Sequence, residues 1–219
     1  MKKILIENFH EISLLVGEEK TDVISVMPDQ ISFKNNRDMK VGESHNVVVR
    51  VLDKLCDISL HVNSIENKIV EAKVEGSCDI YRNFVTDYFN AEIQGMNLKE
   101  ISKEQTKNAP EGEPYWFFVD SDNEIYYTAV KEKITSFQIA FSGEMICFDG
   151  NGVIIGSKWE EDSDRIKAKG SDLIKEGSKL SKNTMELLFR FIQSCQKIKS
   201  DHKKEILSII KKRFEKDWA

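Results

Sequence analysis

Apolar and polar residues alternate along much of the first hundred residues, a pattern typical of strands that bury one face. The alternation is clearest in "HNVVVRVLD" and "CDISLHVNSI", where one side is aliphatic and the other is polar. Strands that recur about every ten residues with polar turns between them predict a barrel or sandwich. The predicted strands are Lys3–Ile6, Asp22–Met27, Gln30–Lys34, His45–Leu52, Cys56–Ser64, Lys68–Glu75 and Tyr88–Ile93.

Two short helices are expected around the end of this strand-rich half. The segment "GSCDIYRNFVTDYF" interrupts the alternation and can hold one of them. The other would begin at Asn97 as N-cap, with Glu100 at the third helical position. The composition then turns polar in "NLKEISKEQTKNAPEGEP", with two prolines and a glycine. We therefore predict one domain over residues 1–105 and a second over residues 106–219.

The second half begins with a run of aromatic and β-branched segments separated by turn residues. The segments "YWFFV", "EIYYTAV", "ITSFQIAF", "EMICFD" and "VIIG" predict an antiparallel meander of about five strands. An open sheet of this kind is stable only when its apolar face is covered by another element.

The C-terminal segment has the helical spacing that such a cover requires. Ser181 or Asn183 would begin it, with Glu186 as a capping partner of Asn183. The apolar stripe thins near Ser200, so one long helix and two shorter helices are both compatible with it. The stripe consists of Leu187, Leu188, Phe191, Ile192, Cys195, Ile198, Ile206, Ile209, Ile210 and Phe214. The predicted fold class is mainly β, α+β: a barrel, then an antiparallel sheet domain covered by a long C-terminal helix.

Composition narrows the class of protein. The chain has 219 residues, 40% of them hydrophobic and 32% charged, which are globular values. No apolar run approaches the roughly 20 residues that cross a bilayer. The opening "MKKILIENFHEISLL" is interrupted by polar residues and reads as a strand, so we expect a cytoplasmic protein. The net charge of −5 disfavours nucleic acid as a partner, although the segment after Gln196 is basic.

No pattern of catalytic or metal-binding residues emerges. The loop from Asp120 to Glu124 lacks the glycine and the glutamate of a calcium loop. The glycines from Gly150 to Gly156 flank β-branched residues, so a turn is favoured over a phosphate loop. We expect no enzyme activity, no metal and no cofactor. The cysteines are scattered, which favours buried free thiols. The four histidines are expected at surface or partly buried positions; they are His10, His45, His61 and His202.

The first half resembles the PilZ family, small bacterial β-barrels that often bind cyclic di-GMP. The resemblance covers about Ile4 to Ile101 and is carried by "DVISVMPDQISF", "MKVGESHNVVVRV" and "FNAEIQGMNLKEIS". The last of these resembles the final strand and helix of the family. The resemblance implies a PilZ-like β-barrel with a regulatory or signalling role.

The family's ligand-binding residues are missing. PilZ receptors hold phosphates with an R-x-x-x-R pair, but the first arginine of this chain is Arg37. The D-x-S-x-x-G motif is broken as well, since Asp22 and Ser25 are one residue too far apart. Cyclic di-GMP is therefore not the expected ligand. A receptor with a non-standard site remains the alternative, with Lys34, Arg37 or Arg50 as its basic residues.

The leading hypothesis is a non-enzymatic bacterial regulatory or adaptor protein that contacts another protein. The aromatic strands place Trp116 and Phe118 on one sheet face and Tyr115 and Phe117 on the other. Packing in a core is one interpretation of these residues, and a partner surface is the other. The same choice applies to the C-terminal helix, which would cover its own sheet or form a homo-oligomer. The predicted partner-binding residues are Trp116, Phe118, Tyr126, Phe191 and Phe214.

Overall fold

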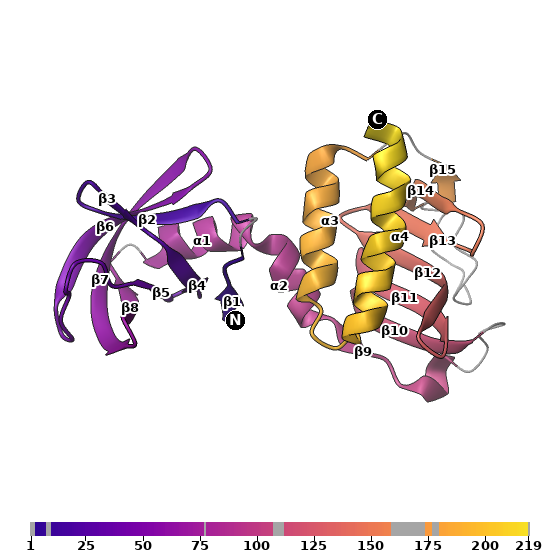
Figure 1. Cartoon of the computed structure of the whole chain (residues 1–219), viewed down its shortest axis with the longest axis horizontal. Coiled ribbons are helices and arrows are strands. Elements are labelled where there is room, and N and C mark those ends of the chain that lie inside the picture. Colours follow the sequence, from indigo (N-terminus) through magenta and orange to yellow (C-terminus); the bar gives the residue numbers. More distant parts are fainter. Residues whose placement is uncertain are drawn as a thin grey trace. The chain divides into compact units, whose positions relative to one another are not determined.

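The computed structural model describes residues 3–7, 10–76, 78–106, 112–158, 174–176 and 180–218. The chain divides into two compact units, Met1–Ile93 and Gln94–Ala219, and the division falls within a helix. Each unit contains one antiparallel sheet with helices packed against it (Figure 1). The mainly β, α+β class predicted from the sequence is confirmed. In the part of the chain that is described, no helix is both long and apolar enough to span a membrane.

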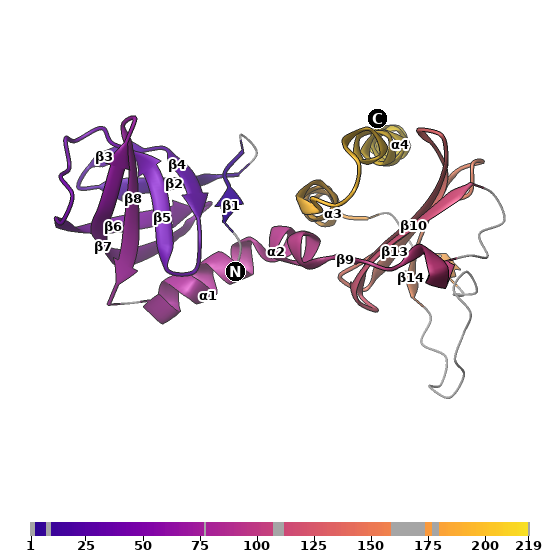
Figure 2. The same cartoon turned by 90° about the horizontal axis from the view of Figure 1, so that it is seen from below.

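Unit 1 is an eight-stranded sheet that curls around its apolar side, as Figure 2 shows. The strand order is β1-β4-β5-β8-β7-β6-β2-β3, and every recorded pair is antiparallel. The strands are β1 (Ile4–Leu5), β2 (Ile12–Val16), β3 (Glu19–Thr21), β4 (Val23–Val26), β5 (Gln30–Lys34), β6 (Ser44–Val51), β7 (Lys54–Glu66) and β8 (Ile69–Glu75).

The helix α1 (Cys78–Tyr88) packs against β7 and β8 and helps to close the core of unit 1. Its residues Tyr81 and Val85, together with Phe89 just after it, are fully buried at a spacing of four. The hydroxyl of Tyr81 donates to the carbonyl oxygen of Gln30 at 3.3 Å. Burial raises the pKa of this phenol well above its ordinary value.

Three predictions in this region are wrong or incomplete. Tyr88–Ile93 is not a strand, because α1 ends there and α2 (Asn90–Asn97) begins. No helix begins at Asn97; α2 ends at that residue and the short strand β9 (Lys99–Glu100) follows. The hairpin of β2 and β3 was not among the expected strands. The remaining strands of the first half and the helix in "GSCDIYRNFVTDYF" are confirmed.

Unit 2 is a seven-stranded meander in the order β15-β14-β13-β12-β11-β10-β9. The five predicted strands are present as β10 to β14. A 3-10 helix, η1 (Lys103–Thr106), follows β9. The other strands are β10 (Glu113–Asp120), β11 (Asn123–Val130), β12 (Lys133–Phe141), β13 (Glu144–Phe148), β14 (Val153–Lys158) and β15 (Ile174–Glu176).

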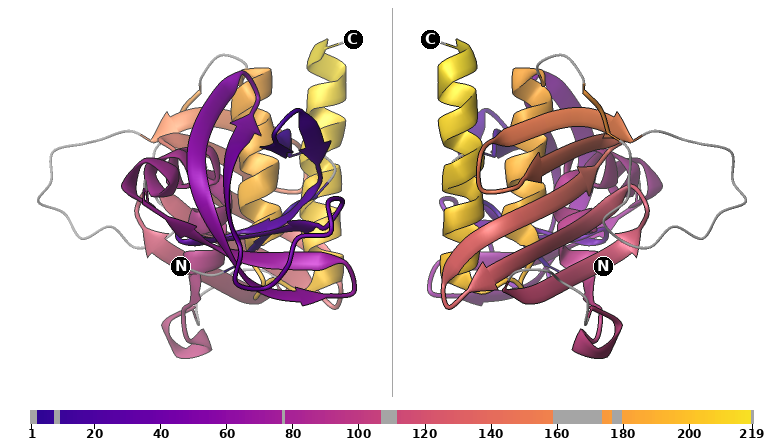
Figure 3. Two further views of the ribbon diagram at one scale, coloured as in Figure 1. Left: turned by 90° about the vertical axis from the view of Figure 1, so that its left-hand side faces the viewer. Right: turned by 90° about the vertical axis from the view of Figure 1, so that its right-hand side faces the viewer.

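Two C-terminal helices cover one face of this sheet, as Figures 2 and 3 show. They are α3 (Lys182–Ser194) and α4 (Ser200–Trp218), so the C-terminal segment forms two helices and not one long helix. Ser181 is the N-cap of α3, because its Oγ accepts a hydrogen bond from the backbone N–H of Thr184 at 3.0 Å. The predicted apolar stripe faces the sheet, and Leu188, Ile206 and Ile210 are fully buried.

Candidate functional site

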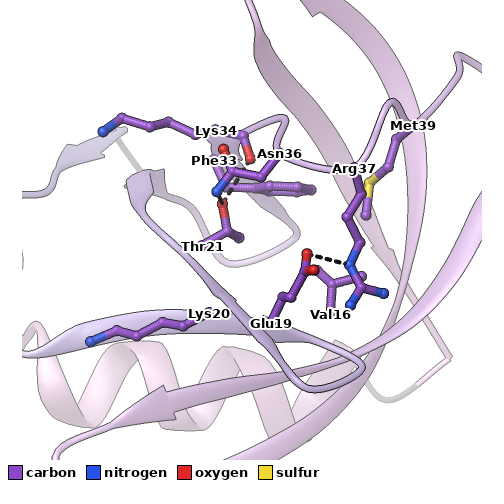
Figure 4. A pocket seen from close by; sticks show the side chains of 9 residues that line it. All are labelled: Val16, Glu19, Lys20, Thr21, Phe33, Lys34, Asn36, Arg37 and Met39. Atoms are coloured by element: carbon purple, nitrogen blue, oxygen red, sulfur yellow. Dashed lines mark hydrogen bonds and ion pairs between the residues drawn. The ribbon is translucent and has the colours of Figure 1, made fainter.

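Two of the three basic residues proposed as ligand contacts line one pocket of unit 1. Lys34, at the end of β5, and Arg37, in the loop after it, lie on either side of Asn36 (Figure 4). The third cation of the pocket is Lys20 from β3, which the sequence did not single out. The pocket has a cavity volume of only about 10 Å³ and is lined by Val16, Glu19, Lys20, Thr21, Phe33, Lys34, Asn36, Arg37 and Met39.

Two exposed ion pairs involve the cations of this pocket. Arg37 Nε donates to Glu19 Oε2 at 2.8 Å, and Lys34 Nζ donates to Asp22 Oδ2 at 2.7 Å. The hydrogen bond and the charge of Lys34 lower the pKa of the Asp22 carboxyl. All four side chains are more than a third exposed, so these pairs contribute little stability. Because exposed pairs are weak, an anion can compete with the carboxylates for the cations.

Gly17 makes room for the arginine of this pocket. It occupies the turn between β2 and β3 with φ of 64°, a conformation that glycine adopts without strain. A Cβ at this position would lie 3.2 Å from Nη1 of Arg37. Because Gly17 has no side chain, the Arg37 guanidinium lies close to the backbone of this turn.

Arg50 is not part of this pocket. Its Nε donates to the carbonyl oxygen of Leu52 at 3.1 Å, across the turn that joins β6 and β7. Leu52 has φ of 52°, which is unusual for a leucine. Arg50 thus supports a strained turn, and the structure does not bring it to Lys34 and Arg37.

The proposed partner surface divides between two locations. Tyr115 and Tyr127 contact His202 of α4, so the alternate residues Trp116, Phe118 and Tyr126 lie on the opposite sheet face. Each of the three is half-buried. Trp116 and Tyr126 are directly paired across β10 and β11. The rings of Trp116 and Phe118 meet edge to face with centroids 6.0 Å apart. Burial raises the pKa of the Tyr126 phenol.

Phe191 and Phe214 are at the other location, inside the core of unit 2. Their exposed fractions are 0% and 1%. Phe191 stacks on Phe141 of the sheet with ring centroids 4.7 Å apart. The prediction that these two residues face a partner conflicts with this burial, because the helices turn their stripe toward the sheet.

A polar cluster with a buried centre and an exposed end joins the sheet to α4, and sequence reasoning missed it. The hydroxyl of Tyr127 lies 3.1 Å from Nδ1 of His202, and Tyr115 stacks on Tyr127 with centroids 4.8 Å apart. Lys199 Nζ donates to the Tyr115 hydroxyl at 3.1 Å, and that hydroxyl donates to Glu113 Oε2 at 2.8 Å. Burial, followed by the neighbouring Tyr115, raises the pKa of Tyr127.

Two of the four histidines depart from the expectation of surface or partly buried positions. His10 and His202 are buried, with exposed fractions of 8% and 1%, while His45 and His61 are partly exposed. Both buried rings contact aromatic residues: His10 contacts Phe89, and His202 contacts Tyr115 and Tyr127. No group of three or more His, Cys, Asp or Glu side chains that could hold a metal ion occurs among the described residues.

Comparison with known proteins gives little further information. No family model matches the sequence, and no curated protein matches it. One similar solved structure is that of an uncharacterized Legionella protein, with 4% identity and a TM-score of 0.36. The similarity covers 41% of this chain and 96% of the Legionella chain. The Borreliella burgdorferi PlzA protein, solved in complex with c-di-GMP, is similar over 87% of this chain and 93% of its own, with 10% identity and a TM-score of 0.31. TM-scores this low assign the chain to no family.

Proposed function

We propose that this chain is a non-enzymatic regulatory or adaptor protein of the bacterial cytoplasm that acts through protein–protein contacts. The observation that carries the proposal is the cross-strand pair of Trp116 and Tyr126, with Phe118 beside it, on the sheet face opposite α3 and α4. Tyrosine and tryptophan are enriched among the residues that dominate binding energy at protein interfaces. We name Trp116, Phe118 and Tyr126 the aromatic face.

The chemistry of the aromatic face suits a protein partner. Each ring combines a large apolar area with little side-chain entropy to lose on binding, and Tyr126 also carries a hydroxyl. The rings stand on paired strands, so their positions are fixed before a partner arrives. The resemblance of the first half to PilZ proteins supports a regulatory role, and its missing arginine pair argues for protein contacts over the usual nucleotide.

The experiment is a comparison of variants in a capture assay. Immobilised wild-type chain, Trp116→Ala, Tyr126→Ala and a control variant at an exposed residue of α1, Ile80→Ala, are incubated with lysate of the source bacterium. We expect a protein that wild type and the control retain and that both face variants lose, with circular dichroism showing all four folded. Retention of the same proteins by every variant, or of none by wild type, contradicts the proposal.

A second candidate function is a nucleotide receptor, and the pocket around Lys34 and Arg37 favours it. Three cations, Lys20, Lys34 and Arg37, line one cavity. The cavity itself is only about 10 Å³, close to the space that one water molecule needs and far below the 300–1,000 Å³ typical of pockets that enclose a drug-sized ligand. A phosphate group would therefore bind at the surface above these cations, with the rest of the dinucleotide also outside the cavity.

Calorimetric titration with cyclic di-GMP tests this second function. A receptor gives saturable heat that is lost in Arg37→Ala and retained in Lys54→Ala, a control on β7 outside the pocket. Absence of heat from a folded chain removes the receptor function and leaves the adaptor function in place.

A further inference from the structure

The strand β6 of unit 1 extends beyond its partner β2. The last recorded pair between them is Leu15↔Val48. The chain then turns at Gly17 into β3 instead of continuing along β6. Within the described residues, the part of β6 before Val48 is paired with β7 on one side and with no strand on the other. An open strand edge of this kind is a template for another strand.

Two hydrogen bonds show which backbone groups face the open side. Alternate residues of an antiparallel strand direct their N–H and C=O toward the same neighbour. Leu52 N donates to Glu11 O at 3.0 Å, so even-numbered residues point toward β2. Val62 N donates to Glu43 O at 2.9 Å, so odd-numbered residues point toward β7. The N–H and C=O of Asn46 therefore face the space that β2 leaves open.

A groove of about 340 Å³ lies at this edge. Leu15 and Val48, which are paired across the strands, give it an apolar wall, and Asp57 is paired with Val48 on β7. The Asp57 carboxylate forms no hydrogen bond or ion pair with the residues that the structure describes. The full lining is Leu15, Gly17, Asn46, Val47, Val48, Asp57, Ile58 and Ser59.

We propose that this groove binds an extended segment of a partner protein. The segment pairs its backbone with Asn46 and lays a lysine or arginine side chain along the groove toward Asp57. An open edge selects a peptide backbone, because that backbone carries N–H and C=O groups at the matching spacing. A long basic side chain fits the lining, since its apolar stem packs on Leu15 and Val48 and its charged head meets the free carboxylate.

This proposal concerns unit 1 and is independent of the aromatic face in unit 2. We expect Trp116→Ala to retain peptide binding at the groove, and variants of the groove to retain the partner of the aromatic face. The segment is assigned to a partner protein and not to a second copy of the chain. A concentration-dependent dimer that Asn46→Pro dissociates would overturn this assignment.

Amide hydrogen exchange tests the open edge directly. We expect the N–H of Asn46 to exchange quickly and that of Val47, which bonds β7, to exchange at least tenfold more slowly. Equal protection of the two amides would show that the edge is closed and would overturn the proposal.

Peptide titration followed by NMR tests the occupant. The probes are N-acetylated heptapeptides of alternating threonine and valine with arginine, alanine or glutamate at the centre. We expect the arginine peptide to shift the amides of Asn46, Val48 and Ser59, and the glutamate peptide to leave them unchanged. Shifts at none of these amides at millimolar peptide, or equal shifts with all three peptides, would overturn the proposal.

Variants separate the backbone from the carboxylate. Asn46→Pro removes the open N–H and should abolish binding, while Asn46→Thr keeps the N–H and should bind. Asp57→Asn should weaken the arginine peptide about threefold, the size of an exposed ion pair. Asp57→Lys should make the groove bind the glutamate peptide more tightly than the arginine peptide. This reversal tests the role of the charge even if Asn46→Pro fails to fold. Asp53→Asn, on the nearby turn, is the matched control, and an effect as large as that of Asp57→Asn would contradict the assignment.

Discussion

His10 Nε2 lies 2.7 Å from Glu92 Oε1, and the two side chains are 2% and 4% exposed. The backbone N–H of Glu7 donates to the other ring nitrogen, Nδ1, at 2.9 Å. Because Nδ1 accepts, the ring hydrogen is on Nε2, which donates to the Glu92 carboxylate. This pair fixes α2 to the segment before β2, so it joins the two ends of unit 1.

Replacing Glu92 should destabilise unit 1. Glu92→Ala removes the acceptor of a buried ring N–H, and loss of such a partner costs about 1–3 kcal/mol in the free energy of unfolding. Glu92→Gln keeps an acceptor oxygen and should cost less. Urea denaturation measures both, with the exposed Glu66→Ala as control. A loss below about 0.5 kcal/mol for Glu92→Ala, the range of ordinary surface changes, would contradict the role of the pair.

Gly95 should not tolerate a side chain. A Cβ at this position of α2 would overlap the carbonyl oxygen of Phe191 in α3. Alanine is intrinsically the better helix former by about 1 kcal/mol, so propensity alone predicts that Gly95→Ala stabilises. Overpacking against backbone costs about 1–3 kcal/mol and should reverse the sign.

Gly152→Ala is the matched control for this effect, since a Cβ there meets nothing within 4 Å. Thermal unfolding of the two variants gives the comparison. A melting temperature for Gly95→Ala at or above wild type would show that α2 and α3 separate freely.

Unit 2 should lose stability at alkaline pH through Tyr127. Burial raises the folded-state pKa of this phenol above its ordinary value of 10.0. Because the folded-state pKa of the phenol is above its unfolded-state pKa, its contribution to stability is fully present below about pH 10. That contribution is lost as the pH rises from there toward the folded-state pKa. The free energy of unfolding should therefore fall above about pH 10 in wild type and fall less in Tyr127→Phe. Equal slopes in the two proteins would show that Tyr127 ionises freely in the folded state.

The N-cap of α3 should contribute measurably. Ser181→Ala removes the hydroxyl that accepts from Thr184 N, and loss of such a cap costs about 1 kcal/mol. Ser208→Ala, at an exposed position inside α4, should be neutral or slightly stabilising because alanine favours helix. The two variants differ in the same atoms, so equal stabilities by urea denaturation would contradict the cap.

The second sheet could be predicted from its sequence, because the alternation of side chains along each strand shows which residues share a face. Alternation placed Tyr115 and Phe117 on one face and Trp116 and Phe118 on the other, and burial confirms the division. The helix α1 could also be found, since Tyr81, Val85 and Phe89 repeat at the helical interval of four. The prediction of a strand over Tyr88–Ile93 was wrong because the β-prone residues of this segment were given more weight than the helical spacing of Tyr81, Val85 and Phe89.

Contacts between distant segments could not be predicted in this way. His10 and Glu92 are 82 positions apart, and Tyr127 and His202 are 75 apart. No local pattern shows that such residues will meet, because the fold of the whole unit brings them together. The pocket is an intermediate case: Lys34 and Arg37 are close in sequence, whereas Lys20 joins them only through the hairpin of β2 and β3.

Site-specific photo-crosslinking at the aromatic face tests the central claim most directly. A benzophenone amino acid replaces Tyr126 in one protein and the exposed Ile80 of α1 in the other, and both are irradiated in cells of the source organism. We predict one discrete protein adduct from position 126, lost when Trp116→Ala is added, and none of that mass from position 80. No adduct from position 126, or the same adducts from both positions, would contradict the assignment of this face to a protein partner.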